Sequence, residues 1–121
     1  MPWRKEGPVS IADGVTVNAG ASQVLGDFPI GDAEVVGFRF EVTYDAAASA
    51  GCTINVYPGD GQDFDTEPLF TYTLGFEAGA TVKETHQEDV RGIPGFLRIE
   101  AVNNDGSVAL TITCRAWRAG R

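Results

Sequence analysis

The sequence predicts an all-β protein, an antiparallel β-sandwich of about eight strands, jelly-roll or Greek-key in type, with no substantial helix. Three observations indicate this class. Apolar and polar residues alternate with a period of two in successive runs, as in strands with one buried and one wet face. The runs recur at roughly regular spacing, and the chain contains 15 glycines and six prolines, a composition that favours short strands joined by turns. No stretch shows convincing helical periodicity, and periodicity alone does not define the strand order.

The N-terminal part divides into an arm and the first strands of a single domain. Residues 1–8, MPWRKEGP, combine two prolines, a tryptophan and mixed charge, which predicts an extended N-terminal arm. One sandwich domain is expected over 9–121, ending in a basic segment. Short strands are expected on either side of Asp13-Gly14, a tight-turn signal, and proline and glycine predict a loop over 28–32.

The central part holds the clearest strand and the longest hairpin. The strand spans 35–44, and its alternate residues form one apolar face: Val36, Phe38, Phe40, Val42 and Tyr44. A small-residue connector, DAAASAG, leads to two alternating runs, CTINVY and FTYTLGF, which flank the acidic segment PGDGQDFDTEP. We therefore expect a long β-hairpin over 52–76 with an acidic tip, and the rest of the chain organised around it.

The C-terminal part completes the predicted sandwich. A short strand is expected over 81–85, a polar loop over 86–95 and a further strand over 96–103, with Leu97, Ile99 and Ala101 facing inward. Asn104-Asp105-Gly106 predicts a hairpin turn, since Asp-Gly tolerates the positive φ that such turns need. The last strand is expected over 107–117, with this inner face: Val108, Leu110, Ile112, Cys114 and Ala116.

Length, composition and charge restrict the function. A chain of 121 residues, 43% hydrophobic and 21% charged, is expected to fold as one domain. The net charge of −8 is unevenly spread, because five of the nine basic residues but only one of the 17 acidic residues lie near the two ends. An acidic body repels nucleic acid, so no nucleic-acid partner is expected. No apolar run approaches the roughly 20 residues of a membrane span, and the first residues do not resemble a signal peptide, so no membrane partner is expected.

The basic, tryptophan-bearing ends are the leading candidate for a partner-binding surface. Arginine and tryptophan are enriched at protein interfaces, and cations complement an acidic neighbour. The residues expected to contact acidic protein surfaces are Trp3, Arg4, Lys5, Arg115, Trp117, Arg118 and Arg121. Two alternatives stay open: the end charges are merely solvated, and Trp117 packs locally at the edge of the sandwich.

The acidic tip of the hairpin is the second candidate site, with these residues: Tyr57, Asp60, Asp63, Phe64, Asp65 and Glu67. Exposed aromatic rings stack on sugars or anchor an interface. Asp60, Asp63 and Asp65 are spaced closely enough for a calcium site, but they do not match the helix–loop–helix ligand pattern. The favoured interpretation is that aspartates cap the turns of this loop. A glycosidase pair of carboxylates would need a cleft that a hairpin tip does not offer.

No arrangement of residues indicates catalysis, so we expect no enzyme activity, no metal and no cofactor. His86 is the single histidine, no serine lies in a G-x-S-x-G elbow, and no phosphate-binding loop occurs. Cys52 and Cys114 both fall on apolar strand faces. A disulfide between facing strands is one alternative, and two buried free thiols, favoured in a protein made in a cytoplasm, are the other.

Two segments carry a resemblance to a known class of protein. The run VVGFRFEVTYDAAASAGCTINVYPGDGQDFDTEP, followed by FLRIEAVNNDGSVALTITCRAW, resembles small virion proteins of tailed bacteriophages. The likeness covers about 35–117 and lies in the order of strands, small-residue connector, DG loop and closing turn. INVYPGDG also resembles the strand and turn of discoidin-like carbohydrate-binding modules, although the rest of that module's length is missing.

The phage resemblance implies a β-sandwich that acts by binding within a virion. We expect a capsid decoration or cement protein that docks on a phage shell at many repeated sites, with other virion proteins and further copies of itself as partners. The chain would be made in the host cytoplasm and reside in the virion. A carbohydrate- or receptor-binding module on a tail or fibre, with a glycan as ligand, is the first alternative. An accessory subunit of a tail or neck ring is the second.

Overall fold

The computed structural model describes residues 4–93 and 95–120, which form eight β-strands and contain no helix. The strands are β1 (Arg4–Val17), β2 (Ser22–Pro29), β3 (Val35–Tyr44), β4 (Cys52–Gly59), β5 (Phe70–Thr73), β6 (Thr81–Asp89), β7 (Phe96–Asn103) and β8 (Leu110–Gly120). In this described part of the chain, no helix is long and apolar enough to cross a membrane. The prediction of an all-β protein is confirmed.

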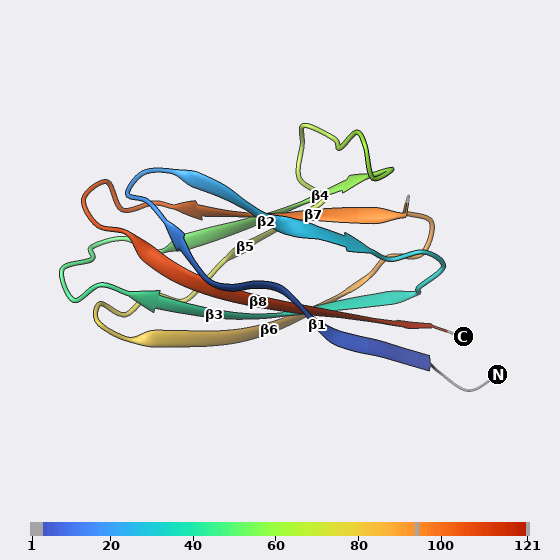
Figure 1. The fold of residues 1–121 in the computed structure, drawn as a ribbon, viewed down its shortest axis with the longest axis horizontal. Helices are drawn as coiled ribbons and strands as arrows, with labels where there is room; N and C mark the ends of the chain where they lie inside the picture. The colour runs from blue at the N-terminus through green and yellow to red at the C-terminus, as the bar shows by residue number, and fades with distance from the viewer. Residues whose placement is uncertain (1–3, 94, 121) are drawn as a thin grey trace.

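The strands form two four-stranded antiparallel sheets packed face to face (Figure 1). Sheet A has the order β1-β8-β3-β6, and sheet B has the order β2-β7-β4-β5. The antiparallel pairs β1–β8, β2–β7, β3–β6 and β4–β5 are nested inside one another along the chain. This is the strand order of a jelly roll, in which a long nested hairpin is rolled into a sandwich.

The β4–β5 hairpin is the innermost of these nested pairs. Its strands pair from Thr53↔Thr73 to Val56↔Phe70, and the tip loop between them, residues 60–69, rises above sheet B (Figure 1). β5 ends at Thr73, so the second run is shorter than predicted, and Phe76 is exposed. In sheet B, β4 is an interior strand and β5 is an edge strand, so only the first strand of the predicted hairpin is central.

The apolar core lies between the two sheets, where the alternating positions meet. The inward-facing residues of β3 are all buried, as are those predicted for β7. On β8 the inner face begins at Leu110, because Val108 precedes the strand. Burial of such side chains stabilises the fold by about 1.5–3 kcal/mol each before the entropic cost is subtracted.

β1 differs from its prediction because it is one long strand. Arg4, Lys5 and Glu6, placed in the arm by the sequence, pair with Gly120, Ala119 and Arg118 of β8. Asp13-Gly14 does not turn the chain: the register shifts between Ala12 and Val15, and Gly14 has a φ of 61°. The same glycine that suggested a turn therefore allows a bulge within the strand.

Three connecting segments also differ from their predictions. β2 continues through Phe28 and Pro29, where a loop was expected; β2 is an edge strand, in which proline is tolerated. β6 runs to Asp89, so His86 lies in a strand and not in a polar loop. The expected hairpin turn at 104–106 is wrong, because β7 belongs to sheet B and β8 to sheet A. That segment crosses between the sheets.

Candidate partner-binding surface

The pairing of β1 with β8 brings the two basic ends of the chain together. Arg4 and Lys5 pair with Gly120 and Ala119 of β8, so each lies within two residues of Arg118 or Trp117 in the partner strand, and Arg115 precedes Trp117 by two residues. Five of the seven residues predicted for partner binding therefore share one pair of strands. Trp3 and Arg121 lie outside the described residues.

Trp117 lies flat on the outer face of sheet A. Its neighbour in β3 is Gly37, and a Cβ added to Gly37 would stand 2.0 Å from Cε2 of the indole. The absence of a side chain at Gly37 is therefore what lets the ring lie on the sheet. The ammonium group of Lys5 is 5.6 Å from the ring centroid, so the indole is capped by a cation. Trp117 is half-buried, which combines local packing with an accessible ring face.

Two arginines face each other next to this tryptophan. Arg115 of β8 and Arg39 of β3 are cross-strand neighbours on the outer face of sheet A, in a row that continues to Ser10 and Thr85. Like charges directly opposite each other destabilise a sheet. Arg39 has one carboxylate nearby, Glu41, at 3.7 Å. We call the outer-face group of Lys5, Arg39, Lys83, Arg115 and Trp117 the basic face.

Arg39 and Lys83 are members of this surface that the sequence did not assign. The alternation in β3 predicted that Arg39 faces solvent, and this was the one indication in the sequence that Arg39 could belong to a binding surface. Arg39 contributes to the basic face because it lies opposite Arg115, and this pairing is known only once the strand order is known.

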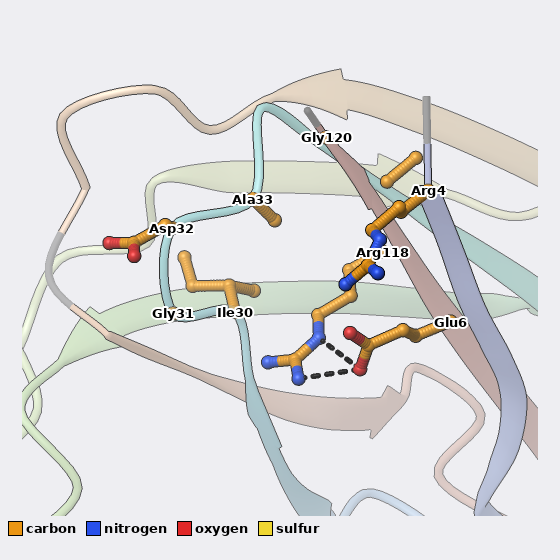
Figure 2. A pocket seen from close by; sticks show the side chains of 9 residues that line it. Arg4, Glu6, Ile30, Gly31, Asp32, Ala33, Arg118 and Gly120 are labelled. Atoms are coloured by element: carbon orange, nitrogen blue, oxygen red, sulfur yellow. Dashed lines mark hydrogen bonds and ion pairs between the residues drawn. The ribbon is translucent and has the colours of Figure 1, made fainter. Parts of the chain in front are cut away.

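Arg118 has a different role from the basic face. Its guanidinium donates to the carboxylate of Glu6 at 2.7 Å and to the carbonyl oxygen of Pro29 at 2.9 Å. Figure 2 shows this ion pair at the side of a cavity of about 320 Å³, which is also lined by Arg4 and by the loop from Ile30 to Ala33. Arg118 thus fastens the end of sheet A to β2, and Arg4 remains the exposed cation at this cavity.

The acidic tip loop is organised by its own aspartate. Asp60 Oδ1 accepts hydrogen bonds from the backbone N–H groups of Gln62 and Asp63, at 2.9 and 2.8 Å. These donors lower the pKa of the Asp60 carboxyl. Within the described residues, no group of three or more His, Cys, Asp and Glu side chains is placed to hold a metal ion. The geometry at Asp60 is that of the turn-capping interpretation.

The aromatic residues of the tip are already engaged by sheet B. The guanidinium of Arg98 stacks 4.1 Å from the ring centroid of Phe64, and Arg98 also forms an ion pair with Asp27. The hydroxyl of Tyr57 donates to Glu100 at 3.0 Å. A shallow hollow of about 300 Å³ lies between Pro58 and Asp65, beside Phe64, and could receive a ligand at the tip.

His86 belongs to a polar cluster at the open edge of the sandwich, between β5 and β6. Its ring stacks on Tyr72 with centroids 4.1 Å apart, and Nε2 lies 3.1 Å from Glu84. The Tyr72 hydroxyl donates to Glu88 at 2.7 Å, and burial raises the pKa of Tyr72. Inward-facing charged groups on an edge strand also protect that edge from pairing with another chain. The contacts of His86 with Tyr72 and Glu84 therefore indicate a structural role at this edge of the sandwich.

Both cysteines are buried and free, so the alternative of two reduced thiols is the one observed. Burial raises the pKa of each thiol to about 12. Since the thiolate is the reactive form, neither sulfur is activated as a nucleophile.

Comparison with known proteins shows the fold. No protein-family model and no curated protein matches the sequence. The chain superposes on VP2 of infectious bursal disease virus, in the crystal structure of a VP2 subviral particle, with a TM-score of 0.64 and 10% identity. That match covers 98% of this chain and 32% of the VP2 chain, so the protein spans about a third of the length of that neighbour.

Two further structures are similar over most of this chain. The SPBc2 prophage-derived protein YomS aligns with a TM-score of 0.56 at 11% identity, covering 99% of this chain and 96% of YomS. A CBM4 carbohydrate-binding structure aligns with a TM-score of 0.55 at 10% identity, covering 92% and 66%. The fold is thus shared with a protein of a virus-derived particle, a prophage protein and a carbohydrate-binding module.

Proposed function

We propose that this protein is a structural component of a phage virion, a capsid decoration protein that docks on the shell through its basic face and the adjoining end of β1. The observation that carries the proposal is the pair of opposed arginines beside a cation-capped, half-buried tryptophan. The opposition of the two arginines does not stabilise the sheet by itself, whereas an acidic protein partner would neutralise their charge.

The fold comparisons support the same class of function. About a third of the VP2 chain of a subviral particle, and nearly the whole length of the prophage protein YomS, share this fold. A shared fold is compatible with a virion component, but it does not by itself assign a role. Docking at many equivalent lattice sites would make weak individual contacts add up through effective concentration. An accessory subunit of a tail or neck ring would use the same surface.

A binding assay with the virion parts tests this proposal. Full-length protein is mixed with purified shells and, separately, with purified tails of the phage that encodes it, and pelleted with them. Trp117→Ala should weaken binding to shells at least about tenfold, since interface tryptophans often contribute that much or more. Phe64→Ala, which removes an aromatic residue from the opposite side, is the matched control and should leave shell binding unchanged.

Deleting residues 1–7 would be a poorer test, because it removes the β1 residues that pair with the end of β8. Undiminished shell binding by Trp117→Ala, or no binding by the unaltered protein, contradicts the decoration proposal. Binding to tails alone supports the ring-subunit alternative.

The second candidate function is carbohydrate or receptor binding at the tip loop. It is favoured by the similarity to the CBM4 structure and by the hollow beside Phe64. A glycan array probed with the intact protein tests it, and a hit that Phe64→Ala abolishes and Trp117→Ala retains would establish the tip as the binding site.

A further inference from the structure

The basic face is not neutralised by its own chain. Four of the nine Lys and Arg residues of the protein lie there, although the net charge is −8. In the described part of the chain, Lys5, Lys83 and Arg115 form no ion pair. Glu41 is the carboxylate paired with this group in the described residues, and the distance from its Oε1 to Arg39 Nε is long, at 3.7 Å. The face thus keeps an excess of positive charge around an aromatic ring.

The tip loop presents the opposite charge on the opposite side of the molecule. Its four carboxylates, at Asp60, Asp63, Asp65 and Glu67, are exposed, and none is ion-paired within residues 4–93 and 95–120. Figure 1 shows the loop rising above sheet B, away from sheet A, whose outer face points the other way.

The loop is also held in one shape before any partner arrives. The Asp65 N–H donates to the Pro58 carbonyl at 2.9 Å, and the Asp60 N–H donates to the Asp63 carbonyl at 3.1 Å. Phe64 is fixed beneath Arg98. A loop that is ordered in advance loses little conformational entropy on binding.

We infer that the basic face binds the tip loop of a second copy of this chain. The carboxylates of the loop would approach Arg39, Arg115 and Lys83, with the indole of Trp117 as the apolar floor. Because the two surfaces point in opposite directions, the contact is heterologous and head-to-tail, so it builds a ring if the rotation closes and a filament if it does not. This inference goes beyond the proposed function, since it requires no capsid and no glycan. Both contacts use the basic face, so the face of one copy binds either a shell or a second copy at a time.

Charge reversal of the purified, full-length protein tests the contact. The face variant is Arg39→Glu with Arg115→Glu, the tip variant is Asp63→Lys with Asp65→Lys, and the swapped variant combines all four changes. Sedimentation velocity at low and high salt measures the assembly of the 12.9 kDa chain. Asp32→Lys with Glu77→Lys is the control, because it changes the net charge as the tip variant does at exposed sites outside the tip loop.

We expect the unaltered protein and the control to assemble beyond a dimer at low salt and to dissociate as salt screens the contact. Each single-surface variant should associate at least about tenfold more weakly. The swapped variant should recover assembly, since the two new carboxylates on its face can pair with the two new ammonium groups on its tip. An equimolar mixture of the face and tip variants should also assemble.

Two results would overturn the inference: an unaltered protein that stays monomeric at low salt, and a swapped variant that fails to recover. The tip variant keeps the residues that the decoration proposal uses. If it binds shells while remaining monomeric in solution, decoration stands independently of self-assembly.

Discussion

The outer faces of the two sheets hold their charges in opposite ways. On sheet B, Arg98 donates two hydrogen bonds to Asp27 and covers Phe64, and Glu100 accepts from Tyr57. On sheet A, Arg39 stands opposite Arg115. These charges on the strands of sheet B are matched within the fold, whereas the charges of the basic face, like those of the tip loop, are available to a partner outside it.

The difference separates structural charges from charges available for binding. A charged group with its partners in the same chain contributes to stability and has little left to offer a ligand. A group held beside a like charge lowers stability, and such local costs are typical of binding surfaces. By this criterion the basic face is the stronger candidate for a binding surface, because the charged side chains on the strands of sheet B already have partners in the same chain.

Asp105 is the extreme case of an internally matched charge. It lies in the crossing between β7 and β8 and is 3% exposed. One carboxylate oxygen accepts from the N–H groups of Ser49 and Ala50, and the other accepts from those of Ser107 and Val108. These four donors tie two loops from different parts of the chain to one side chain.

The largest effect we predict is therefore the loss of stability in Asp105→Asn. The new amide would turn an NH₂ group toward N–H donors at one of the two sites, so hydrogen bonds are lost in a buried setting. The midpoint of thermal unfolding should fall by several degrees, more than for Arg98→Thr or Arg115→Thr. Asp45→Asn, at an exposed carboxylate that accepts one backbone hydrogen bond, is the control and should change the midpoint little.

The pH dependence of this loss gives a sharper test. The backbone donors, that of Ser49 first, lower the pKa of Asp105 from 3.8 to about 2. A carboxyl with a lowered pKa stabilises the fold fully above its ordinary pKa, and this contribution disappears as the pH falls toward 2. The difference in stability between the unaltered protein and Asp105→Asn should therefore narrow from pH 4 to pH 2. A constant difference over that range would contradict the assignment.

The sequence predicted the parts of the fold that depend on local alternation. The inner faces of β3 and β7 are those expected, because period two directly assigns each residue to a face. Alternation fails where a strand is polar on both sides. β6 borders the open edge of the sandwich, and its inner positions include Glu84, His86 and Glu88, so the pattern resembled a loop beyond residue 85.

Neighbours across the sheet are what the sequence did not predict. Asp-Gly at 105–106 has the local chemistry of a hairpin turn, but the nested topology sends the flanking strands to different sheets. The basic ends were recognised by composition, whereas the opposition of Arg39 and Arg115 depends on strand order. Both facts are set by contacts distant in sequence, which a period of two does not encode.

A medium effect is expected from Arg98→Thr, on the matched face of sheet B. The substitution leaves Asp27 without its ion pair and uncovers Phe64, so the tip loop loses its anchor. We expect the unfolding midpoint to fall by a few degrees and amide hydrogen exchange to speed up over residues 60–67. Arg91→Thr is the matched control, because its pair with Asp89 is exposed and local, and such pairs contribute little. If both substitutions lower the unfolding midpoint equally, the ion pair of Arg98 is no more important for stability than the exposed pair of Arg91.

The smallest effect has the opposite sign, and it is expected on the basic face. Arg115→Thr removes the repulsion with Arg39 and places a β-branched residue in line with Thr111 and Thr113, so the protein should become more stable by about 0.5 kcal/mol. Denaturant unfolding at low salt measures the gain, at a protein concentration too low for self-assembly, because association would itself stabilise the unaltered protein. The gain should shrink in 1 M salt, where the repulsion is screened over about 3 Å. Lys83→Thr is the comparison, since Lys83 stands opposite Glu41 and its loss should not stabilise. If Arg115→Thr is more stable than the unaltered protein but binds its partner more weakly, Arg115 is retained for binding. If Arg115→Thr is less stable at low salt, this arginine has a structural role, like the matched charges of sheet B.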